Sequence, residues 1–441
     1  MLNFTSKKEY AKKQIHIKFQ LMRKNGFYFI MMTAMLLIIN MNSFAQDWHQ
    51  WRGAQRDGVV KKADINLDWT AKKPPLAWSF KQAGMGYSSP AIVGTTLYCQ
   101  GAVDKKGFVF SLDAQTGVLK WKQELGDEIV EDRENAPRGT ITIDGDKLYL
   151  IRGIGQIHCL AAADGKVIWT KDFKKDFNGV LMSRWGYSES PLIDGNLVIC
   201  TPGGDDGAII ALDKNTGATI WRVNDLKDKA GYSSPIIAEV DGVKQYIQST
   251  SNSVVGISKD GKLLWKVDVP TFRTAVVPTP VYNENMVFAT SGYNAGCVGI
   301  KLTKSGDSFK ADTVYFNKNM VNHHGGVVLV NGYIYGYSDP SGWVCQNFKT
   351  GETVWKERNS EVAKGAVLAV NDRLILLNER NGLLTLIGAS PDGYKEYGRI
   401  EFPERTQNST TDNCVWPHPV IANNKLYVRD HDLMFCYDLK K

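Results

Sequence analysis

Short apolar runs, separated by turn residues, recur along most of the chain. The stretch "YSSPAIVGTTLYC", from Tyr87, contains two apolar runs joined by a glycine turn, and "YSESPLIDGNLVIC", from Tyr187, has the same order. Two apolar runs around such a turn predict a β-hairpin. No long segment repeats apolar residues with the 3.6-residue period of a helix, so a helical solenoid is poorly supported. Eight such hairpins are predicted, starting at Tyr87, Arg138, Tyr187, Tyr232, Val277, His324, Lys364 and Trp416.

A second phrase falls between these hairpins. The sequence "DAQTGVLKW" covers Asp113–Trp121 and "DKNTGATIW" covers Asp213–Trp221, with Asp, Thr, Gly and Trp at the same spacing. Aspartate accepts hydrogen bonds from backbone N–H groups in a turn, and glycine supplies a positive φ. The phrase therefore predicts another hairpin, so that each unit of about 45 residues contains four strands. Related copies lie at Ala161–Trp169, Ser258–Trp265 and Phe348–Trp355, with degenerate ones at Leu302–Phe309 and Ala389–Tyr397.

Eight four-stranded units predict an all-β fold, an eight-bladed β-propeller over residues 76–441. The last unit ends at "FCYDLKK" and lacks an outer strand, whereas "PLAWSF" (Pro75–Phe80) precedes the first unit. We expect this N-terminal strand to join the last blade, because that pairing closes the ring and removes an open sheet edge. Residues 46–75 are predicted to form an extended N-terminal segment.

The formal net charge of +7 is concentrated at the N-terminus. Residues 1–45 contain six lysines and one arginine against one glutamate, a charge of +6, so the remainder carries +1. Charge therefore gives no indication of a nucleic-acid partner.

Residues 1–45 have the pattern of a secretory signal peptide. A basic stretch begins at Met22, a second candidate start, an apolar run covers Phe27–Ile39, and the small residues of Ser43–Ala45 suit cleavage. We expect a mature chain from Gln46, exported to the periplasm or the extracellular side, with no membrane span. An uncleaved anchor helix is the alternative.

The chain contains seven cysteines, an odd number, with no adjacent pair and no CxxC. Six of them lie inside or at the end of apolar, strand-like runs. We expect buried single thiols that behave as small hydrophobic side chains, and the alternative is one or two disulfides formed after export.

The Asp-x-x-Thr-Gly-x-x-x-Trp phrase resembles the tryptophan-docking motif of the quinoprotein alcohol dehydrogenase-like propellers, also called PQQ-repeat proteins. The resemblance covers about residues 76–441. The stretch "WHQWRGAQRDGV" (Trp48–Val59) is similar to the N-terminal segment of secreted bacterial PQQ-like repeat proteins. The resemblance implies that the repeated tryptophans pack between blades, on a peptide plane of the neighbouring blade. These tryptophans are Trp121, Trp169, Trp221, Trp265 and Trp355.

The family that this chain resembles includes PQQ-dependent dehydrogenases, polyvinyl-alcohol dehydrogenase-like proteins and BamB-type outer-membrane assembly scaffolds. The fold therefore leaves the function open. The adjacent cysteine pair of the large quinoprotein alcohol dehydrogenases is missing here, as is a haem-binding CxxCH. PQQ with Ca²⁺ thus stays an open cofactor assignment.

A functional site is expected where loops converge at the central channel. The links into each innermost strand are rich in cations, which suit carboxylates, and in aromatic rings, which suit stacking. They predict an anionic or planar ligand, such as PQQ or an acidic sugar, with ordinary solvated loop polarity as the alternative. Binding candidates are Arg138, Arg184, Trp185, Arg273, Lys364 and Trp416, and catalytic candidates are His323, His324, His418 and Tyr187. The same links contain Arg133, and the turns between second and third strands add Arg152, Asp205, Asp206, Asp339, Glu379, Arg380, Asp430 and His431.

No metal site is predicted, since the sequence has neither an HExxH motif nor a carboxylate-rich calcium loop. The adjacent His323 and His324 would point apart on a strand.

Three functions fit the sequence, ranked as follows. The first is a monomeric, exported propeller that binds a small molecule, a carbohydrate or a protein partner. The second is a PQQ-dependent dehydrogenase of a sugar or alcohol, and the third is an enzyme that acts on acidic sugars through His and Tyr acid–base pairs.

Overall fold

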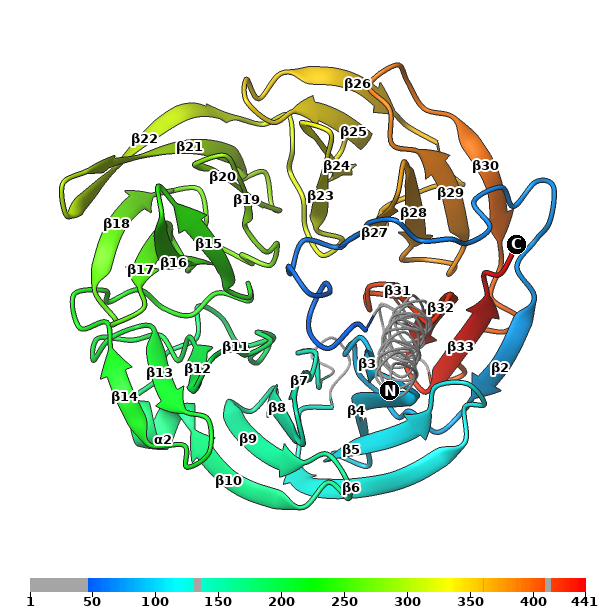
Figure 1. The fold of residues 1–441 in the computed structure, drawn as a ribbon, viewed down its shortest axis with the longest axis horizontal. Coiled ribbons are helices and arrows are strands. Elements are labelled where there is room, and N and C mark those ends of the chain that lie inside the picture. Colours follow the sequence, from blue (N-terminus) through cyan, green and yellow to red (C-terminus); the bar gives the residue numbers. More distant parts are fainter. Residues whose placement is uncertain (1–46, 131–135, 360, 409–413) are drawn as a thin grey trace, which may run out of the picture. The chain divides into compact units, whose positions relative to one another are not determined.

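The computed structural model describes residues 47–130, 136–359, 361–408 and 414–441. Within these residues, β-strands form eight sheets around a central axis, and one five-residue helix, α2 (Phe173–Phe177), follows the second sheet (Figure 1). The prediction of an eight-bladed, all-β propeller is confirmed. The predicted leader, residues 1–45, and Arg133 lie outside the described residues. No helix in the described part of the chain is long and apolar enough to cross a membrane.

Each blade is built on four antiparallel strands, which in blades 1 to 7 follow in sequence order from the channel to the rim (Figure 1). Blade 1 contains β3 (Ala91–Val93), β4 (Thr96–Val103), β5 (Lys106–Asp113) and β6 (Leu119–Asp127). Blade 2 contains β7 (Thr142–Asp144), β8 (Lys147–Ile151), β9 (Gln156–Ala161) and β10 (Val167–Asp172). Blade 3 contains β11 (Leu192–Asp194), β12 (Leu197–Cys200), β13 (Ile210–Asp213) and β14 (Thr219–Arg222). Blade 4 contains β15 (Ile236–Val240), β16 (Val243–Ser249), β17 (Ser253–Ser258) and β18 (Leu263–Asp268).

The second half of the ring repeats this arrangement. Blade 5 contains β19 (Val281–Asn283), β20 (Met286–Ser291), β21 (Gly296–Ser305) and β22 (Ser308–Asn317). Blade 6 contains β23 (Val327–Val330), β24 (Tyr333–Ser338), β25 (Gly342–Asn347) and β26 (Thr353–Glu357). Blade 7 contains β27 (Gly365–Val370), β28 (Arg373–Asn378), β29 (Leu384–Gly388) and β30 (Glu396–Ile400), and β1 (Val59–Val60) pairs in parallel with β27. Blade 8 contains β31 (Val420–Ala422), β32 (Lys425–Asp430), β33 (Leu433–Asp438) and β2 (Leu76–Phe80).

The ring is closed by the N-terminal strand, as the sequence predicts. β2 runs antiparallel to β33, with Phe80 opposite Met434 and Trp78 opposite Cys436. Trp78 is buried, and its Nε1 donates to the carbonyl of Ala114 in blade 1, 3.1 Å away. The two ends of the propeller are thereby joined within one blade, and the eighth blade docks on the first.

The middle strands of the blades form the core. β32 is buried along its whole length, and the seven cysteines are buried and free. Buried single thiols are what the apolar runs predict. Tight turns connect the first two strands, and at Asn331 and Gly332 both φ angles are positive, as a two-residue hairpin turn requires.

The repeated tryptophans dock each blade on the next. Trp169 Nε1 donates to the carbonyl of Lys214 at 2.9 Å, and the indole lies on Gly217, where an added Cβ would fall 2.9 Å from the ring. The glycine of the Thr-Gly phrase is thus required both for its φ of +70° and for the close approach of the preceding blade's indole. The pattern recurs at Trp78 on Gly117, Trp121 on Gly165 and Trp221 on Gly261.

Blade 5 departs from this pattern. Its two outer strands form one long hairpin that turns between Ser305 and Ser308 without a Thr-Gly phrase. The tryptophan of blade 4, Trp265, is buried among residues of blades 4 and 5, but its Nε1 donates to Gln245 of its own blade at 2.7 Å. Trp265 therefore packs between two blades, as the resemblance implies, but its N–H bonds within its own blade, and blade 5 has no Thr-Gly turn to receive it.

Candidate functional site at the channel mouth

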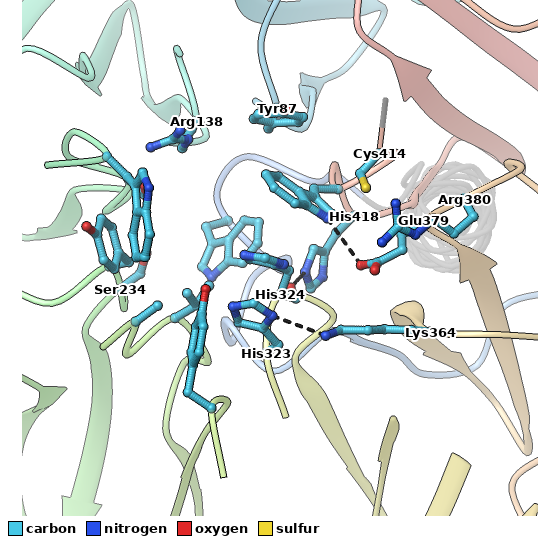
Figure 2. A pocket seen from close by; sticks show the side chains of 18 residues that line it. Tyr87, Arg138, Ser234, His323, His324, Lys364, Glu379, Arg380, Cys414 and His418 are labelled. Atoms are coloured by element: carbon cyan, nitrogen blue, oxygen red, sulfur yellow. Dashed lines mark hydrogen bonds between the residues drawn. The ribbon is translucent and has the colours of Figure 1, made fainter. Parts of the chain in front are cut away.

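A cavity of about 360 Å³ opens where the links into the innermost strands converge on the channel (Figure 2). Its described walls are mainly rings and cations, with a few small polar side chains such as Ser188 and Ser234. Seven of the ten predicted site residues line it, and they come from five different blades. They are Arg138, Trp185, His323, His324, Lys364, Trp416 and His418.

The other three predicted residues do not line the cavity. Tyr187 is buried behind it, where its hydroxyl donates to the carbonyl of Pro202 at 2.9 Å. Arg184 and Arg273 are exposed, and Arg273 Nε donates to the carbonyl of Pro270 at 2.5 Å. A residue's position in its blade is therefore not enough to predict that its side chain lines the cavity. The direction of a side chain also depends on the length and packing of the link that contains it.

Four rings in contact, the first two of them stacked, form one wall of the cavity. The His323 and His324 rings have centroids 3.7 Å apart at 29°, and His324 lies 4.1 Å from Trp416. Trp416 in turn lies 4.6 Å from Tyr87. The two histidines do not point apart, because they precede β23 in an irregular segment rather than on a strand.

Lys364 orients His323 at the edge of this wall. Lys364 Nζ donates to Asp339 Oδ2 at 2.6 Å and lies 3.1 Å from His323 Nδ1 (Figure 2). An ammonium group can only donate, so Nδ1 is the acceptor and the ring proton is on Nε2. That Nε2 is buried and has no hydrogen-bond partner among the described residues. Burial and the nearby Lys364 lower the pKa of His323 to about 3, so the ring is neutral at neutral pH.

The other two histidines are also neutral. His418 Nε2 donates to the carbonyl of His324 at 3.1 Å, and burial lowers the pKa of His418 to about 3. Burial, followed by repulsion from His323, lowers the pKa of His324 well below its usual value, and its Nδ1 has no partner. The histidines thus supply neutral donors and acceptors instead of positive charge.

The charge of the described lining comes from three cations and one carboxylate. Arg138, Lys364 and Arg380 are the cations, and Glu379 is the carboxylate. Glu379 Oε2 accepts from Trp416 Nε1 at 3.1 Å, and burial raises the pKa of Glu379 above its usual value (Figure 2). The site therefore favours an anionic ligand with a flat or ring-shaped body.

The donor set does not fit a hard cation such as the Ca²⁺ that accompanies PQQ. Glu379 is the one carboxylate among the described lining residues, and Trp416 already holds one of its oxygens. No group of three or more His, Cys, Asp or Glu in the described chain is placed to share a metal ion. Ca²⁺ needs six or more oxygen ligands, which this wall does not present.

Two aromatic lining residues, Tyr293 and Trp51, were not found by sequence reasoning. Tyr293 lies in the turn between the second and third strands of blade 5, with φ of +53°, and its ring lies 4.6 Å from that of His323. Trp51 comes from the N-terminal segment and lines the cavity. The WRG triplet that contains Trp51 was the available signal, but its position at the channel depends on how the chain crosses the ring.

Comparison with known proteins supports the same fold. Over 376 residues the chain is 22% identical to the outer membrane protein assembly factor BamB of Yersinia pestis, covering 81% of this chain and 86% of that protein. Over 184 residues it is 31% identical to a quinoprotein ethanol dehydrogenase of Pseudomonas aeruginosa, covering 38% of this chain and 28% of that enzyme. The crystal structure of a quinohemoprotein alcohol dehydrogenase from Comamonas testosteroni superposes with a TM-score of 0.63 at 12% identity, covering 90% of this chain and 81% of that one.

The family match covers more than half of the chain. Residues 105–357, from blade 1 to blade 6, match the PQQ-repeat family described as outer membrane protein assembly factor BamB. The match includes the Thr-Gly turns and docking tryptophans of these blades. The chain therefore belongs to this family of PQQ-like repeat β-propellers.

Proposed function

We propose that the protein is an exported, monomeric binding propeller whose channel-mouth cavity takes a carboxylate-bearing ligand with a flat or ring-shaped body. One observation carries this proposal: three cations and a set of aromatic rings line a single cavity, and two of its histidines each have a buried ring nitrogen without a partner among the described residues. Buried polar atoms without partners are costly unless a ligand or water meets them. The ligand would lie against the wall that contains Trp416 and direct its carboxylate to Lys364 and the Nε2–H of His323.

Export is supported by the predicted leader and by relatives whose names place them in outer-membrane assembly. We place the protein in the periplasm or on the extracellular side. The proposed ligand class also includes PQQ itself, as a flat tricarboxylate, and acidic sugars, which share the carboxylate and the ring.

Calorimetric titration of the full chain tests the proposal and separates the two ligand sources. The probes are PQQ and a trigalacturonate, with the neutral trisaccharide maltotriose as the control. We expect one carboxylate probe to bind with a Kd in the micromolar range and maltotriose to show no heat. Trp416→Ala and Lys364→Gln should each weaken binding about ten-fold or more, because each removes about 1.4 kcal/mol or more of contact. Lys310→Gln, at an exposed lysine on β22, should change nothing. Failure of both carboxylate probes to bind would refute the proposal.

A scaffold that binds a protein partner is the second candidate, because the BamB relatives match most of the chain. The two candidates differ in what the cavity must do. The test is to express the Trp416→Ala variant in cells that lack the gene. If the protein acts as a scaffold, this variant should still restore the levels of outer-membrane proteins. A ligand-binding protein would lose its function with that substitution.

A further inference from the structure

The N-terminal segment Trp48–Val60 crosses the centre of the ring (Figure 1). Its hydrogen bonds and ring contacts reach all eight blades. The backbone of the segment forms hydrogen bonds with the backbone of Ile92 in blade 1 and of Ile143 in blade 2, and the carbonyl of Gly58 accepts from the N–H of Ala369 in blade 7. Its side chains contact the other five blades. These contacts are Arg56 with Ser190 and Pro191 in blade 3 and Pro235 in blade 4, Trp51 with Thr279 in blade 5, Arg52 with Val327 in blade 6, and Trp51 with His418 in blade 8.

Two buried arginines anchor the segment. Arg56 is 2% exposed and donates to the carbonyls of Pro235, Ser190 and Pro191 at 2.6, 2.9 and 2.8 Å. Arg52 donates to the carbonyls of Asp57, at 2.8 Å, and Val327. Five guanidinium N–H donors suit such a set of carbonyls, which converge because the innermost strands all begin near the axis.

Different residues of the N-terminal segment line two separate spaces. On one side Trp51 lines the 360 Å³ cavity, where its Nε1 donates to Thr279 Oγ1 at 2.8 Å and its ring lies 4.6 Å from His418. On the other side, Gln55 and Arg56 line a groove of about 790 Å³ that is bordered by the hairpin tips of blades 5 and 6. Those tips, such as Asn331, lie at the opposite ends of the innermost strands. The segment is thus the floor of the ligand cavity.

The pairing of β2 with β33 closes the ring without this segment. The backbone of the segment pairs with the blades only at the two-residue strand β1, at the bridge of Trp48 with Ile92 and at single hydrogen bonds, and buried side chains make its other contacts. Segments held by few backbone pairs open locally at a lower free energy than the sheets around them.

We propose that Trp48–Gly58 is a separable plug, which docks on an already closed ring and makes the channel a blind pocket with Trp51 as its floor. The inference deepens the proposed function and rests on it for the ligand. If the ligand contacts Trp51, then binding of the ligand and docking of the segment on the ring are thermodynamically linked. Each then raises the equilibrium constant of the other by the same factor.

Hydrogen exchange of the full chain, read by mass spectrometry, tests whether the plug is separable. In Arg56→Ala the amides of residues 48–58 should exchange about ten-fold faster or more, while those of β12 and β16 keep their protection. The neighbouring exposed residue provides the matched control, since Gln55→Ala removes no hydrogen bond of the anchor. The proposal would be refuted if amide exchange in Arg56→Ala were accelerated equally in the blades, or not at all in residues 48–58.

Addition of whichever carboxylate probe binds tests the linkage. At about 100 times its Kd, the probe should slow exchange of residues 48–58 in the wild type by up to about 100-fold. Trp51→Ala should weaken the probe about ten-fold while the blades keep their protection. A probe that binds without slowing exchange, or that binds Trp51→Ala as well as the wild type, would overturn the role of the floor. If the wild type binds neither probe, the proposed function fails, and the exchange of Arg56→Ala still decides whether the plug exists.

Discussion

Trp169, in the seam between blades 2 and 3, and Trp416, at the channel mouth, present their indole N–H groups to different partners. Trp169 donates to a backbone carbonyl of the next blade and lies on a glycine. Trp416 donates to the Glu379 carboxylate and stacks between His324 and Tyr87. A backbone carbonyl is available as an acceptor in almost every blade, so the seam arrangement can repeat around the ring. The side chains that contact Trp416 occur at one place only, so the channel mouth has a set of chemical groups that no seam shares.

The largest effect on the seam side is expected from deletion of residues 76–80. The deletion removes β2, opens the ring and exposes an edge of β33, besides removing the Trp78 contact, which alone accounts for about 3–5 kcal/mol. We expect loss of cooperative thermal unfolding, measured by circular dichroism. Leu76→Ala, at an exposed position of the same strand, is the matched control and should melt like the wild type. A deletion variant with wild-type melting would show that closure does not stabilise the ring.

The next test compares the two tryptophans directly. Trp169→Ala should lower the free energy of unfolding in urea by about 3–5 kcal/mol, because it leaves a cavity at a buried seam. Trp416→Ala should cost about 1 kcal/mol, since its ring borders open space, and should mainly reduce binding of the carboxylate probe. Equal losses of stability in the two variants would contradict the division between seam and mouth.

The smallest effect concerns pH and belongs to the mouth. The folded-state pKa of His418 is lowered to about 3 by burial, against about 6.5 in the unfolded chain. Its contribution to stability is thus fully present above pH 6.5 and is lost as pH falls toward the folded-state pKa, because the unfolded chain binds the proton first. Between pH 6.5 and 5 this amounts to about 2 kcal/mol. His418→Gln should reduce the slope in that part of the pH profile in urea titrations, to which His323 and His324 also contribute, and leave the slope above pH 7 unchanged. An unchanged slope below pH 6.5 would show that His418 is protonated in the folded protein.

The sequence indicated which links surround the channel mouth better than it indicated which side chains of those links line the cavity. The links into the innermost strands do surround one cavity, which His323, His324, Lys364 and Trp416 line. Arg184 and Arg273 come from equivalent links but stay exposed, and Tyr187 packs behind the wall. Side-chain direction in an irregular link depends on local turns and on neighbouring blades, neither of which has a periodic signal.

The sequence by itself determined the number of blades, the docking of most seams and the closure of the ring. These features follow from local patterns that repeat along the chain: apolar runs, turn residues and a tryptophan at blade spacing. The same pattern forms the same structure in almost every unit. Only the tertiary structure decided that Trp265 bonds within its own blade, that two adjacent histidines stack, and that Trp51 forms the floor of the cavity. Each of these depends on contacts between residues far apart in the chain, which the ring brings together and which occur once.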